Sequence, residues 1–549
     1  MKVGRKRFAG VVTALTIAAL ALAGCSNSDS SGSTDTGTTA AGSATSEGAG
    51  ATTSNGGSDA QSAAPAGNAL PDDQQNLTFV PAYGWAGSDI SKNPLEIGVN
   101  MAISQVLDSL VKFDQDMKIV PGLATEWSWN TPTELVFKLR TGVTFSDGTP
   151  FTSADVKGSL ERYIAAEGPL AAVLAPIEKI EAPDDATVKI TTNAPTGTLV
   201  GVLSMVKIGK AEFSHTKSTA ADDAYWAKPI GTGPFVITDY VANDHFSFAR
   251  NDKYWGEKAK LKTLTMKQIT DVNAKITALS NDQVQVLNDL TYDQFDTVKA
   301  LPNVTLSQFD SLSYYFVWFE NSRKPLDNPD VRRAMWMALD LPTIVSSLYG
   351  DSRQTMDSFC PSTAFGCLPA KDMPTYDPEG AKKLLADAGY PNGFSIDMIF
   401  SLANATDSAL AQTLISSWKA IGVTVEPRGL DSATWLKEFQ ALNWYMDFQP
   451  NQTLTGDADY TLNRLYSCVA KRLGYCNPDL DKLMTKAQQS NDKAERLKLY
   501  QQVVDIMAKD VPAIPLFQTK VNVAYKNNVK GLVVPPTEYI DFSTVYLAS

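Results

Sequence analysis

Side chains that could carry out catalysis are sparse in this chain of 549 residues. It has only two histidines, His215 and His245, and neither has a second histidine or a cysteine close enough in sequence to complete a metal site. No GxSxG, HExxH, Walker A or GxGxxG motif is present, and the glycine-rich GTGPF at 231–235 lacks the spacing of a phosphate-binding loop. We therefore expect a protein that is not an enzyme and that uses no cofactor or metal ion.

The five cysteines are the residues with the most informative spacing. Cys25 stands alone near the N-terminus, whereas the other four form two close pairs, Cys360 with Cys367 and Cys468 with Cys476. Local disulfides within each pair are the simplest expectation for an exported protein. A four-cysteine zinc site is the alternative, although neither spacing is a CxxC.

The segment before Cys25 has the pattern of an export signal. MKVGRKRF carries four cations, VVTALTIAALALA is apolar but short for a membrane span, and small residues precede the cysteine. The sequence LAGC at 22–25 resembles the bacterial lipobox, which implies cleavage before Cys25 and a diacylglycerol on its sulfur. We expect residues 1–24 to be a signal peptide. The alternative is an ordinary signal peptide followed by an unrelated cysteine.

Residues 25–75 have a composition that cannot build a core. They are mostly Ser, Thr, Gly and Ala and contain no Lys, Arg or aromatic residue, so little apolar burial would offset the entropy of ordering them. A flexible coil of this length spans roughly 40 Å. We expect a disordered tether that holds the exported protein, through lipidated Cys25, to the outer face of the cell membrane.

The remaining residues, 76–549, form a body long enough for two or three domains. The net charge of the whole chain is −12, and this mild acidic excess argues against nucleic acid as a partner. No second apolar run in the sequence is long enough to cross a bilayer.

Strand-like and helix-like patterns alternate along this body. TELVFKLRTGVTF at 133–145 alternates apolar and polar residues and ends at the turn sequence SDGTP. The helix expected next begins with Thr152 and Asp155 in the spacing of a capping box.

Helix starts are clearest in the C-terminal half. Asn328, Asp377 and Asn477 each precede a proline, which places a capping side chain before a proline at the first helical position. After Asp377 an apolar stripe follows, and Gly389 can end the helix. The expected fold class is α/β.

A family resemblance covers almost all of this body. PGLATEWSWNTPTELVFKLRTGVTFSDGTPFTSADVKGSLERY at 121–163 resembles the signature segment of the oligopeptide/dipeptide class of solute-binding proteins that serve ATP-binding cassette importers. Further segments match the same family in order: GTGPFVITDYVANDHFSFARNDKYW (231–255), RKPLDNPDVRRAMWMALD (323–340), YDPEGAKKLLADAGYPNGF (376–394), WKAIGV (418–423) and VPAIPLF (511–517).

The resemblance implies a two-lobed clamp, like that of periplasmic binding proteins, with three domains and a chain that crosses between the lobes. Domain I would comprise 76–113, 228–312 and 521–549, domain II 114–227, and domain III 313–520. The ligand would lie between domains I and III and be delivered by the monomeric receptor to the permease subunits of the importer.

The family also suggests which residues would contact a peptide. Its peptide-binding members hold the N-terminal ammonium with an aspartate of domain III that follows a central strand, here WYMDFQ at 444–449. Asp457 and Asp459 both fit this position, and Asp457 is preferred. The alternative is that both residues cap the helix that starts near Tyr460.

Aromatic residues provide further candidates for ligand contacts. The segment VPAYGWAGSDI resembles the family loop that bonds the ligand backbone, which nominates Tyr83, Gly84 and Trp85, although Trp85 could equally be a core residue. Trp435 either faces the cleft or packs its helix, and packing is favoured.

One departure from the family weakens the expectation of a dipeptide ligand. Close dipeptide-binding relatives fix the peptide carboxylate with an arginine before the WKAIGV helix, but FSLANATDSAL at 400–410 has no cation. Arg353, Arg428 or Arg464 could take its place. The cysteine pair at 468 and 476 matches the dipeptide-binding branch and favours that branch instead.

The expected function is therefore capture of peptides for an importer. The same clamp could instead bind an oligosaccharide, an opine or a nickel complex, as other members of the class do. An extracellular hydrolase or adhesin is a third possibility that no motif supports.

Overall fold

The computed structural model describes residues 67–549 except 86, 91–95, 167–168, 289 and 403–404. The described residues belong to one compact unit, 64–549. The signal sequence, Cys25 and most of the predicted tether lie outside the described residues. Within the described part, no helix is both long and apolar enough to span a membrane.

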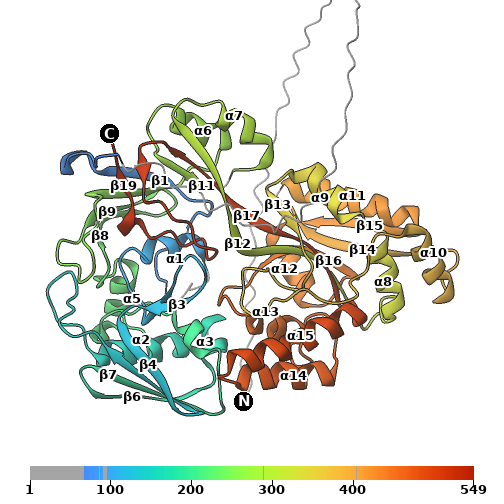
Figure 1. Cartoon of the computed structure of the whole chain (residues 1–549), viewed down its shortest axis with the longest axis horizontal. Helices are drawn as coiled ribbons and strands as arrows, with labels where there is room; N and C mark the ends of the chain where they lie inside the picture. Colours follow the sequence, from blue (N-terminus) through green and yellow to red (C-terminus); the bar gives the residue numbers. More distant parts are fainter. Residues whose placement is uncertain (1–66, 86, 91–95, 167–168, 289, 403–404) are drawn as a thin grey trace, which may run out of the picture. The chain divides into compact units, whose positions relative to one another are not determined.

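The fold is α/β, as predicted, and its largest element is a mixed sheet of eleven strands (Figure 1). Ten strands follow one another in the order β15-β14-β16-β12-β17-β11-β1-β10-β9-β8, and β13 pairs with β17 beside this path. Their bounds are β1 Asn76–Val80, β8 Phe235–Val241, β9 His245–Arg250, β10 Thr263–Lys267, β11 Val286–Asn288, β12 Val304–Phe319, β13 Arg353–Thr355, β14 Phe394–Ser401, β15 Val423–Leu430, β16 Met446–Gln452 and β17 Ala513–Lys526.

The two longest strands, β12 and β17, run side by side through this sheet (Figure 1). They pair antiparallel from Val304 opposite Lys526 to Trp318 opposite Ala513, with a register shift between Asp310 and Tyr314. Both predicted boundaries of domain III, at 312/313 and 520/521, fall within these two strands. At 520/521 the two strands pair with each other, Lys520 with Asp310 and Val521 with Phe309. At 312/313 their pairing is interrupted, and Ser313 pairs with Gln452 of β16 instead.

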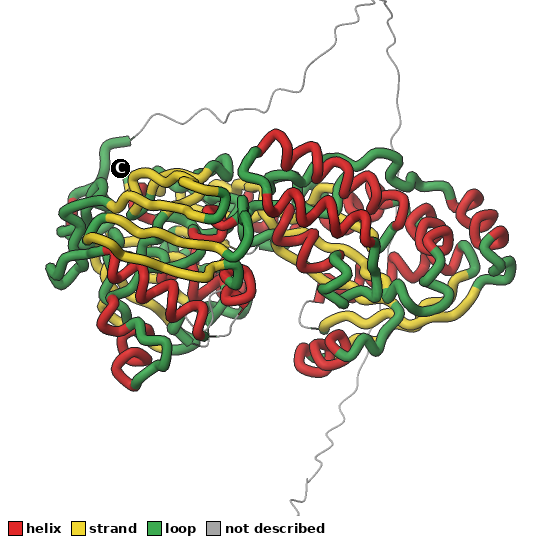
Figure 2. Tube along the Cα trace, turned by 90° about the horizontal axis from the view of Figure 1, so that it is seen from below, coloured by secondary structure: helices red, strands yellow, loops and turns green. Residues whose placement is uncertain are grey.

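Helices pack against the strands of the C-terminal half (Figure 2, helices red and strands yellow). Helix α11 packs against β15 and α12 against β14. The bounds are α8 Pro329–Met337, α9 Leu341–Tyr349, α10 Pro378–Asp387, α11 Ala405–Ala420, α12 Ser432–Gln440, α13 Ala458–Tyr466, α14 Pro478–Gln489 and α15 Lys493–Asp510.

The predicted helix starts in this half are confirmed. The side chains of Asn328, Asp377 and Asn477 each accept a hydrogen bond from a backbone N–H in the first turn, and a proline occupies the start of each helix. Gly389 follows α10 with a φ of +96°, a left-handed conformation that glycine adopts without strain.

A separate four-stranded sheet in the order β4-β5-β7-β6 lies in the N-terminal half. The strand predicted over 133–145 is shorter than expected, because β5 ends at Leu139 and Gly142 turns the chain with a φ of +76°. Thr152 and Asp155 form the predicted capping box of α2. The strands are β4 Ala124–Thr131, β5 Glu134–Leu139, β6 Ile177–Asp184 and β7 Thr187–Thr192.

The other strands form two separate two-stranded sheets, β2-β3 and β18-β19. The remaining strands are β2 Val111–Phe113, β3 Ile119–Pro121, β18 Val529–Lys530 and β19 Tyr546–Leu547. The remaining helices are α1 Ile97–Ile103, α2 Ser153–Ala165, α3 Pro169–Leu174, α4 Leu199–Leu203, α5 Ala220–Ala227, α6 Val272–Ser280 and α7 Phe295–Lys299, with short 3-10 turns at Asp72–Gln74, Ala211–Phe213, Tyr292–Gln294 and Phe542–Thr544.

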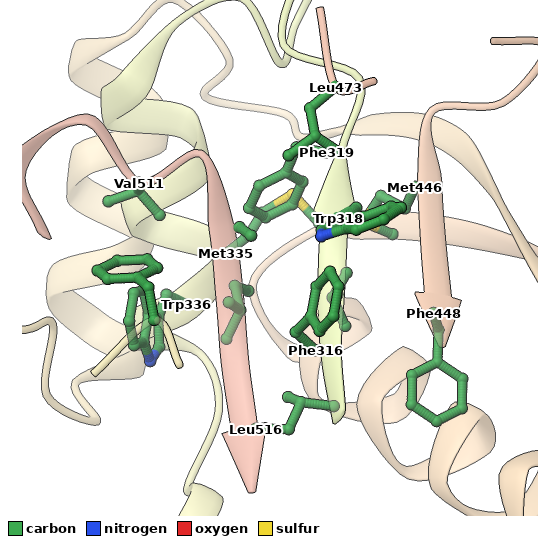
Figure 3. Close-up of a cluster of buried hydrophobic side chains, with 14 of the residues drawn as sticks. Phe316, Trp318, Phe319, Met335, Trp336, Met446, Phe448, Leu473, Val511 and Leu516 are labelled. Atoms are coloured by element: carbon green, nitrogen blue, oxygen red, sulfur yellow. The ribbon is translucent and has the colours of Figure 1, made fainter. Parts of the chain in front are cut away.

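Buried apolar side chains form distinct clusters. One is built only from residues between Leu312 and Phe517, and Figure 3 shows its centre around Phe316, Trp318 and Trp336. The second draws on residues from Leu77 to Val286 and from Val521 to Leu547. A smaller third cluster surrounds Leu279 and Phe295. The first cluster lies almost entirely within residues 313–520, and the domain boundaries stay a prediction.

Residues 67–75, which composition assigned to the tether, contact the C-terminal end of the chain. The Gln75 side chain is 2% exposed; its amide donates to the Leu547 carbonyl at 2.9 Å and its carbonyl accepts from the Leu547 N–H at 2.9 Å. Leu70 also donates its N–H to the Leu547 carbonyl at 2.8 Å.

Both predicted disulfides are confirmed. Cys360 is bonded to Cys367, and Cys468 to Cys476. The described residues include no group of three or more His, Cys, Asp or Glu side chains that could hold a metal ion. Because all four cysteines are bonded in these two disulfides, none is left as a zinc ligand, and the alternative of a four-cysteine zinc site is wrong.

Candidate ligand cavity

A cavity of about 610 Å³ lies beside β12, β16 and β17, and we call it the ligand cavity. Its size is that of pockets that bind small molecules in other proteins. Segments far apart in sequence supply its walls, including Tyr83 after β1, Ser313 and Tyr315 on β12, and Asn451 and Gln452 on β16. Ser313 and Tyr315 are two residues apart on one strand, so their side chains project from the same face.

Five charged side chains line this cavity: Arg353, Asp407, Arg464, Lys520 and Glu538. Both signs are present, so the walls offer partners for a ligand that is itself both positively and negatively charged.

Asp407, in the first turn of α11, is a buried acid of the cavity whose pKa is raised. It is 6% exposed, and burial raises the pKa of its carboxyl to about 7, although a hydrogen bond with Tyr315 and the charge of Arg353 act in the opposite direction. The carboxylate form is thus poorly compensated by its surroundings. A cation entering the cavity would stabilise that form.

Glu538 is the second acid of the cavity, and its backbone is held in an uncommon conformation. Its φ is +68°, its side chain is 5% exposed, and its carboxylate accepts hydrogen bonds from Ser313 Oγ at 3.0 Å and Gln452 Nε2 at 3.5 Å. A left-handed residue other than glycine carries strain, which proteins often retain at binding sites.

Each of the two arginines of the cavity has a buried Nε–H group that forms no hydrogen bond with the described residues. Arg464 donates from Nη2 to Asn451 and lies over the ring of Tyr460 at 4.8 Å, and Arg353 donates from Nη1 to the Ser352 carbonyl at 2.9 Å. The buried Nε atoms of both arginines lack a hydrogen-bond partner in the described part of the chain. Unused buried donors favour an acceptor group from a ligand.

The third arginine proposed as a carboxylate partner lies elsewhere. Arg428 bonds Asp397 and, at 3.0 Å, Glu438, and it does not line the cavity. The structure therefore places Arg353 and Arg464 together with the cavity and separates Arg428 from it.

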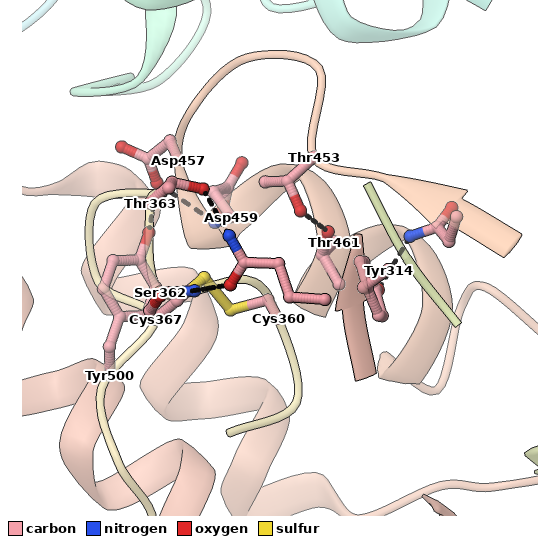
Figure 4. The surroundings of a disulfide bond; sticks show 12 residues. Tyr314, Cys360, Ser362, Thr363, Cys367, Thr453, Asp457, Asp459, Thr461 and Tyr500 are labelled. Carbon is pink, nitrogen blue, oxygen red and sulfur yellow. Dashed lines mark hydrogen bonds between the residues drawn. A yellow bond between two sulfur atoms is a disulfide. The ribbon is translucent and has the colours of Figure 1, made fainter. Parts of the chain in front are cut away.

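Asp457 and Asp459 lie beside the Cys360–Cys367 disulfide, outside the cavity lining (Figure 4). Asp457 Oδ1 and Oδ2 accept from Arg496 Nη2 at 2.7 and 2.8 Å, Tyr500 Oη donates to Oδ1 at 3.0 Å, and Oδ1 caps α13 through the Asp459 N–H at 3.0 Å. Burial and the neighbouring Asp457 raise the pKa of Asp459 to about 7. Their role as ligand contacts stays a prediction.

The predicted aromatic contacts are divided between cavity and core. Tyr83 is 43% exposed and lines the cavity, and Gly84 beside it is exposed. Trp85 is 2% exposed and packs on Phe246, with ring centroids 5.0 Å apart. Trp435 stacks on Phe439 at 5.4 Å between centroids and donates from Nε1 to Asp447 at 2.8 Å, away from the cavity lining.

Sequence reasoning missed the two cavity acids. Asp407 stands within FSLANATDSAL, a segment that we considered only for its lack of a cation, and Glu538 stands in PPTEYI, which carries no motif. No signal in the sequence joins these residues, because they meet only through the fold.

Comparison with known proteins agrees with this architecture. Residues 118–472 match the family "Bacterial extracellular solute-binding proteins, family 5 Middle". The glutathione-binding protein GsiB of Escherichia coli K12 is 26% identical over 448 residues, which cover 79% of this chain and 87% of GsiB.

Solved structures of similar proteins cover nearly the whole described chain. The ABC transporter-associated periplasmic binding protein DppA of Helicobacter pylori, in complex with the peptide STSA, has 25% identity and a TM-score of 0.73 and covers 87% of this chain and 99% of its own. The A. tumefaciens R10 protein AgaA, in complex with agropinic acid, has 25% identity and a TM-score of 0.72 and covers 86% and 99%. The chain belongs to family 5 of the bacterial extracellular solute-binding proteins, which serve ATP-binding cassette importers.

Proposed function

We propose that this protein captures peptides in the ligand cavity and delivers them to the permease subunits of an ATP-binding cassette importer. The observation that carries the proposal is the presence of acids and underused arginines on the walls of one cavity. A peptide with free ends presents one ammonium and one carboxylate, which these groups can both satisfy. The peptide ligand of DppA and the glutathione ligand of GsiB support this substrate class.

Asp407 is the partner that we assign to the peptide ammonium. Its carboxylate is buried and poorly compensated, so a cation placed beside it gains more than it would beside an exposed acid. Arg464, held in place by Asn451 and Tyr460, is assigned to the peptide carboxylate through its unused Nε.

Calorimetric titration with trialanine and N-acetyl-trialanine tests this assignment. Asp407→Asn should weaken binding of free trialanine at least thirtyfold, about 2 kcal/mol, because it removes one member of a buried charged pair. Acetylation should cause a similar loss in the wild type and little further loss in Asp407→Asn, since both changes act on one contact. Asp387→Asn, which alters an exposed acid on α10, is the matched control.

Two other outcomes are informative. If Asp457→Ala and not Asp407→Asn abolishes the preference for a free N-terminus, the anchor is the aspartate that the sequence favoured. If free and acetylated peptides bind equally well, the ammonium contact is absent and the peptide assignment loses its main support.

The rest of the proposal concerns how the receptor works in its setting. Closure of domains I and III around the peptide would let the importer distinguish the loaded receptor, and lipidated Cys25 would keep the exported monomer at the outer face of the cell membrane. Binding and release, without turnover of the peptide, are sufficient for this role.

A non-peptide solute is the second candidate. The complex of the related AgaA with agropinic acid shows that a protein with this fold can hold a different kind of small molecule. Titration with agropinic acid, a panel of oligosaccharides and a nickel chelate would reveal such a ligand, and binding of one of these with no peptide binding would replace the first proposal.

A further inference from the structure

A second cavity of about 440 Å³ lies beside the ligand cavity. The two cavities share Leu454 in their walls. Glu538 lines the ligand cavity, whereas its neighbours Thr537 and Tyr539 line the second cavity. The two cavities therefore adjoin at Leu454 and along the segment 537–539.

Helix α1 links the two cavities in the same way. Ile97 lines the ligand cavity and Asn100 lines the second cavity. These residues are three positions apart on the helix, which corresponds to an axial rise of about 5 Å. The cavities are thus neighbours on three separate segments of the chain.

Lys207 is the exceptional residue of the second cavity. Its side chain is 8% exposed, and the structure gives its ammonium no hydrogen bond or ion pair with any described residue. Burial and the nearby charge of Lys112 lower the pKa of Lys207 to about 8, while Asp108 and Asp541 act in the opposite direction. A buried ammonium without a partner is costly unless an anion is present.

The other charged residues around this cavity already have partners. Lys112 Nζ lies 2.8 Å from Asp108 Oδ1, and the other oxygen of Asp108 accepts from Thr232 at 3.0 Å and Trp255 at 2.9 Å. Asp541 accepts from the Ser543 N–H at 2.9 Å. Both acids act on the charge of Lys207 from a distance, and neither forms a hydrogen bond or ion pair with its ammonium.

Asp114 and Asp116, between β2 and β3, also line the second cavity and form interactions with other residues. Asp114 accepts from the N–H groups of Asp116 and Lys118, both at 2.9 Å, and Asp116 pairs with Lys118 at 3.5 Å. These three interactions lie within the exposed β2–β3 turn and do not involve Lys207.

A second donor in this cavity also lacks an acceptor. The Tyr539 hydroxyl is buried and has no hydrogen-bond partner among the described residues. Burial raises the pKa of Tyr539 well above its usual value, so the hydroxyl keeps its proton and remains a donor at neutral pH. The ammonium of Lys207, a residue that is 8% exposed, and the buried Tyr539 hydroxyl both lack an acceptor among the described residues, and together they complement one anionic group.

We propose that the second cavity is an anion subsite in which the Lys207 ammonium and the Tyr539 hydroxyl bind the side-chain carboxylate of an acidic peptide held in the ligand cavity. The proposal rests on the proposed function for the position of the peptide. It adds a preference for Glu or Asp over their amides at one position of the ligand.

Calorimetric titration with three pairs of tripeptides tests this preference: Glu-Ala-Ala, Ala-Glu-Ala and Ala-Ala-Glu, each against its Gln counterpart. At one position the acidic peptide should bind at least tenfold more tightly than the amide to the wild type. Lys207→Met should reduce that ratio to below twofold, and Tyr539→Phe should reduce it by a smaller factor. Lys118→Met removes an exposed lysine of the β2–β3 turn and should leave the ratio unchanged.

A thermal unfolding measurement separates this role from a structural one. Because Lys207→Met removes an unpaired buried charge, the unliganded variant should unfold at the same temperature as the wild type or higher. A lower unfolding temperature, or a Glu/Gln ratio that persists in Lys207→Met, would overturn the proposal. So would the lack of any Glu/Gln difference in the wild type.

If no tripeptide binds, glutarate alone serves as the probe. Stabilisation of the wild type by millimolar glutarate, absent in Lys207→Met, would support the anion subsite even though the peptide function had failed. Stabilisation of neither protein, or of both equally, would overturn the subsite.

Discussion

Asp457 and Arg496 form an ion pair in which Nη2 lies 2.7 and 2.8 Å from the two carboxylate oxygens, and their side chains are only 14% and 5% exposed. Arg496 also bonds the Ala487 carbonyl at 2.9 Å, so the pair connects the start of α13 with the end of α14 and the start of α15. The aspartate that sequence motifs nominate as a ligand anchor thus also joins three helices.

We expect Asp457→Ala to lower the free energy of unfolding by about 3 kcal/mol, because it leaves the Arg496 guanidinium buried without its carboxylate. Chemical denaturation of the unliganded protein measures this. Asp459→Asn is the comparison variant: the pKa of Asp459 is raised to about 7, so its carboxyl is readily neutralised and the amide should cost less than about 1 kcal/mol. Unchanged stability of Asp457→Ala together with lost peptide binding would instead favour the ligand role.

Features that depend only on neighbouring residues, such as helix caps and short-range disulfides, were predicted correctly from the sequence. The caps at Asn328, Asp377 and Asn477 need only a side chain and a few neighbouring N–H groups, and the disulfides join cysteines seven and eight residues apart. The family resemblance correctly indicated the fold.

The cavity could not be predicted by the same reasoning. Its charged residues come from β13, α11, α13, β17 and the segment before the C-terminus, so no window of sequence contains two walls of the site. Asp457 illustrates the difficulty, because its partner Arg496 is 39 residues away and nothing in the sequence joins the two. Pairing with residues far away in sequence decides which aspartates form ion pairs within the protein and which remain able to bind a ligand.

Peptide binding should weaken in acid. The raised pKa of Asp407, about 7, means that its carboxyl takes up a proton as the pH falls through that value and can no longer pair with an ammonium. Affinity should fall by roughly tenfold per pH unit below about pH 7. Titrations between pH 5 and 7.5 measure this, and the slope should largely disappear in Asp407→Asn.

The same group affects stability with the opposite sign. An acid whose pKa is raised on folding binds more protons in the folded state, so its contribution to the free energy of unfolding falls as the pH rises from about 4 to about 7. Asp447, with a pKa raised to about 8 by burial, acts in the same direction. A slope of unliganded stability that is identical in the wild type and Asp407→Asn would contradict the assigned pKa.

Each disulfide should contribute measurably to stability. A loop of seven or eight residues corresponds to about 2.5 kcal/mol of chain entropy in the unfolded state. We expect Cys468→Ser/Cys476→Ser and Cys360→Ser/Cys367→Ser each to lower the free energy of unfolding by about this amount, measured by denaturant titration. Addition of reductant to the wild type should reproduce the combined loss, and no effect of reductant would show that the bonds do not form in solution.

Membrane retention should depend on Cys25, which lies outside the described residues. Cys25→Ala should give a protein that folds and binds ligand like the wild type but is recovered in the soluble fraction instead of with membranes. Mass spectrometry of the N-terminal peptide of the wild type should show a diacylglycerol on the sulfur. Retention of Cys25→Ala at the wild-type level would rule out the lipid anchor.

Deletion of the first part of the predicted tether and substitution of Gln75 at its end should affect the stability of the body differently. Deleting residues 26–63 removes only chain outside the compact unit and should leave the unfolding temperature of the body unchanged. Gln75→Ala, in contrast, removes a 2% exposed side chain that bonds Leu547 in both directions. It leaves the Leu547 N–H without this acceptor, whereas the Leu547 carbonyl keeps its bond from the Leu70 N–H. A loss of about 2 kcal/mol is expected, because a buried polar group left unpaired costs about 1–3 kcal/mol. Asn76→Ala, next in sequence but exposed, is the control and should change stability by less than about 0.5 kcal/mol.

A fall in unfolding temperature on deletion of 26–63 would show that this segment contacts the body. No loss of stability in Gln75→Ala would show that the body begins only at β1.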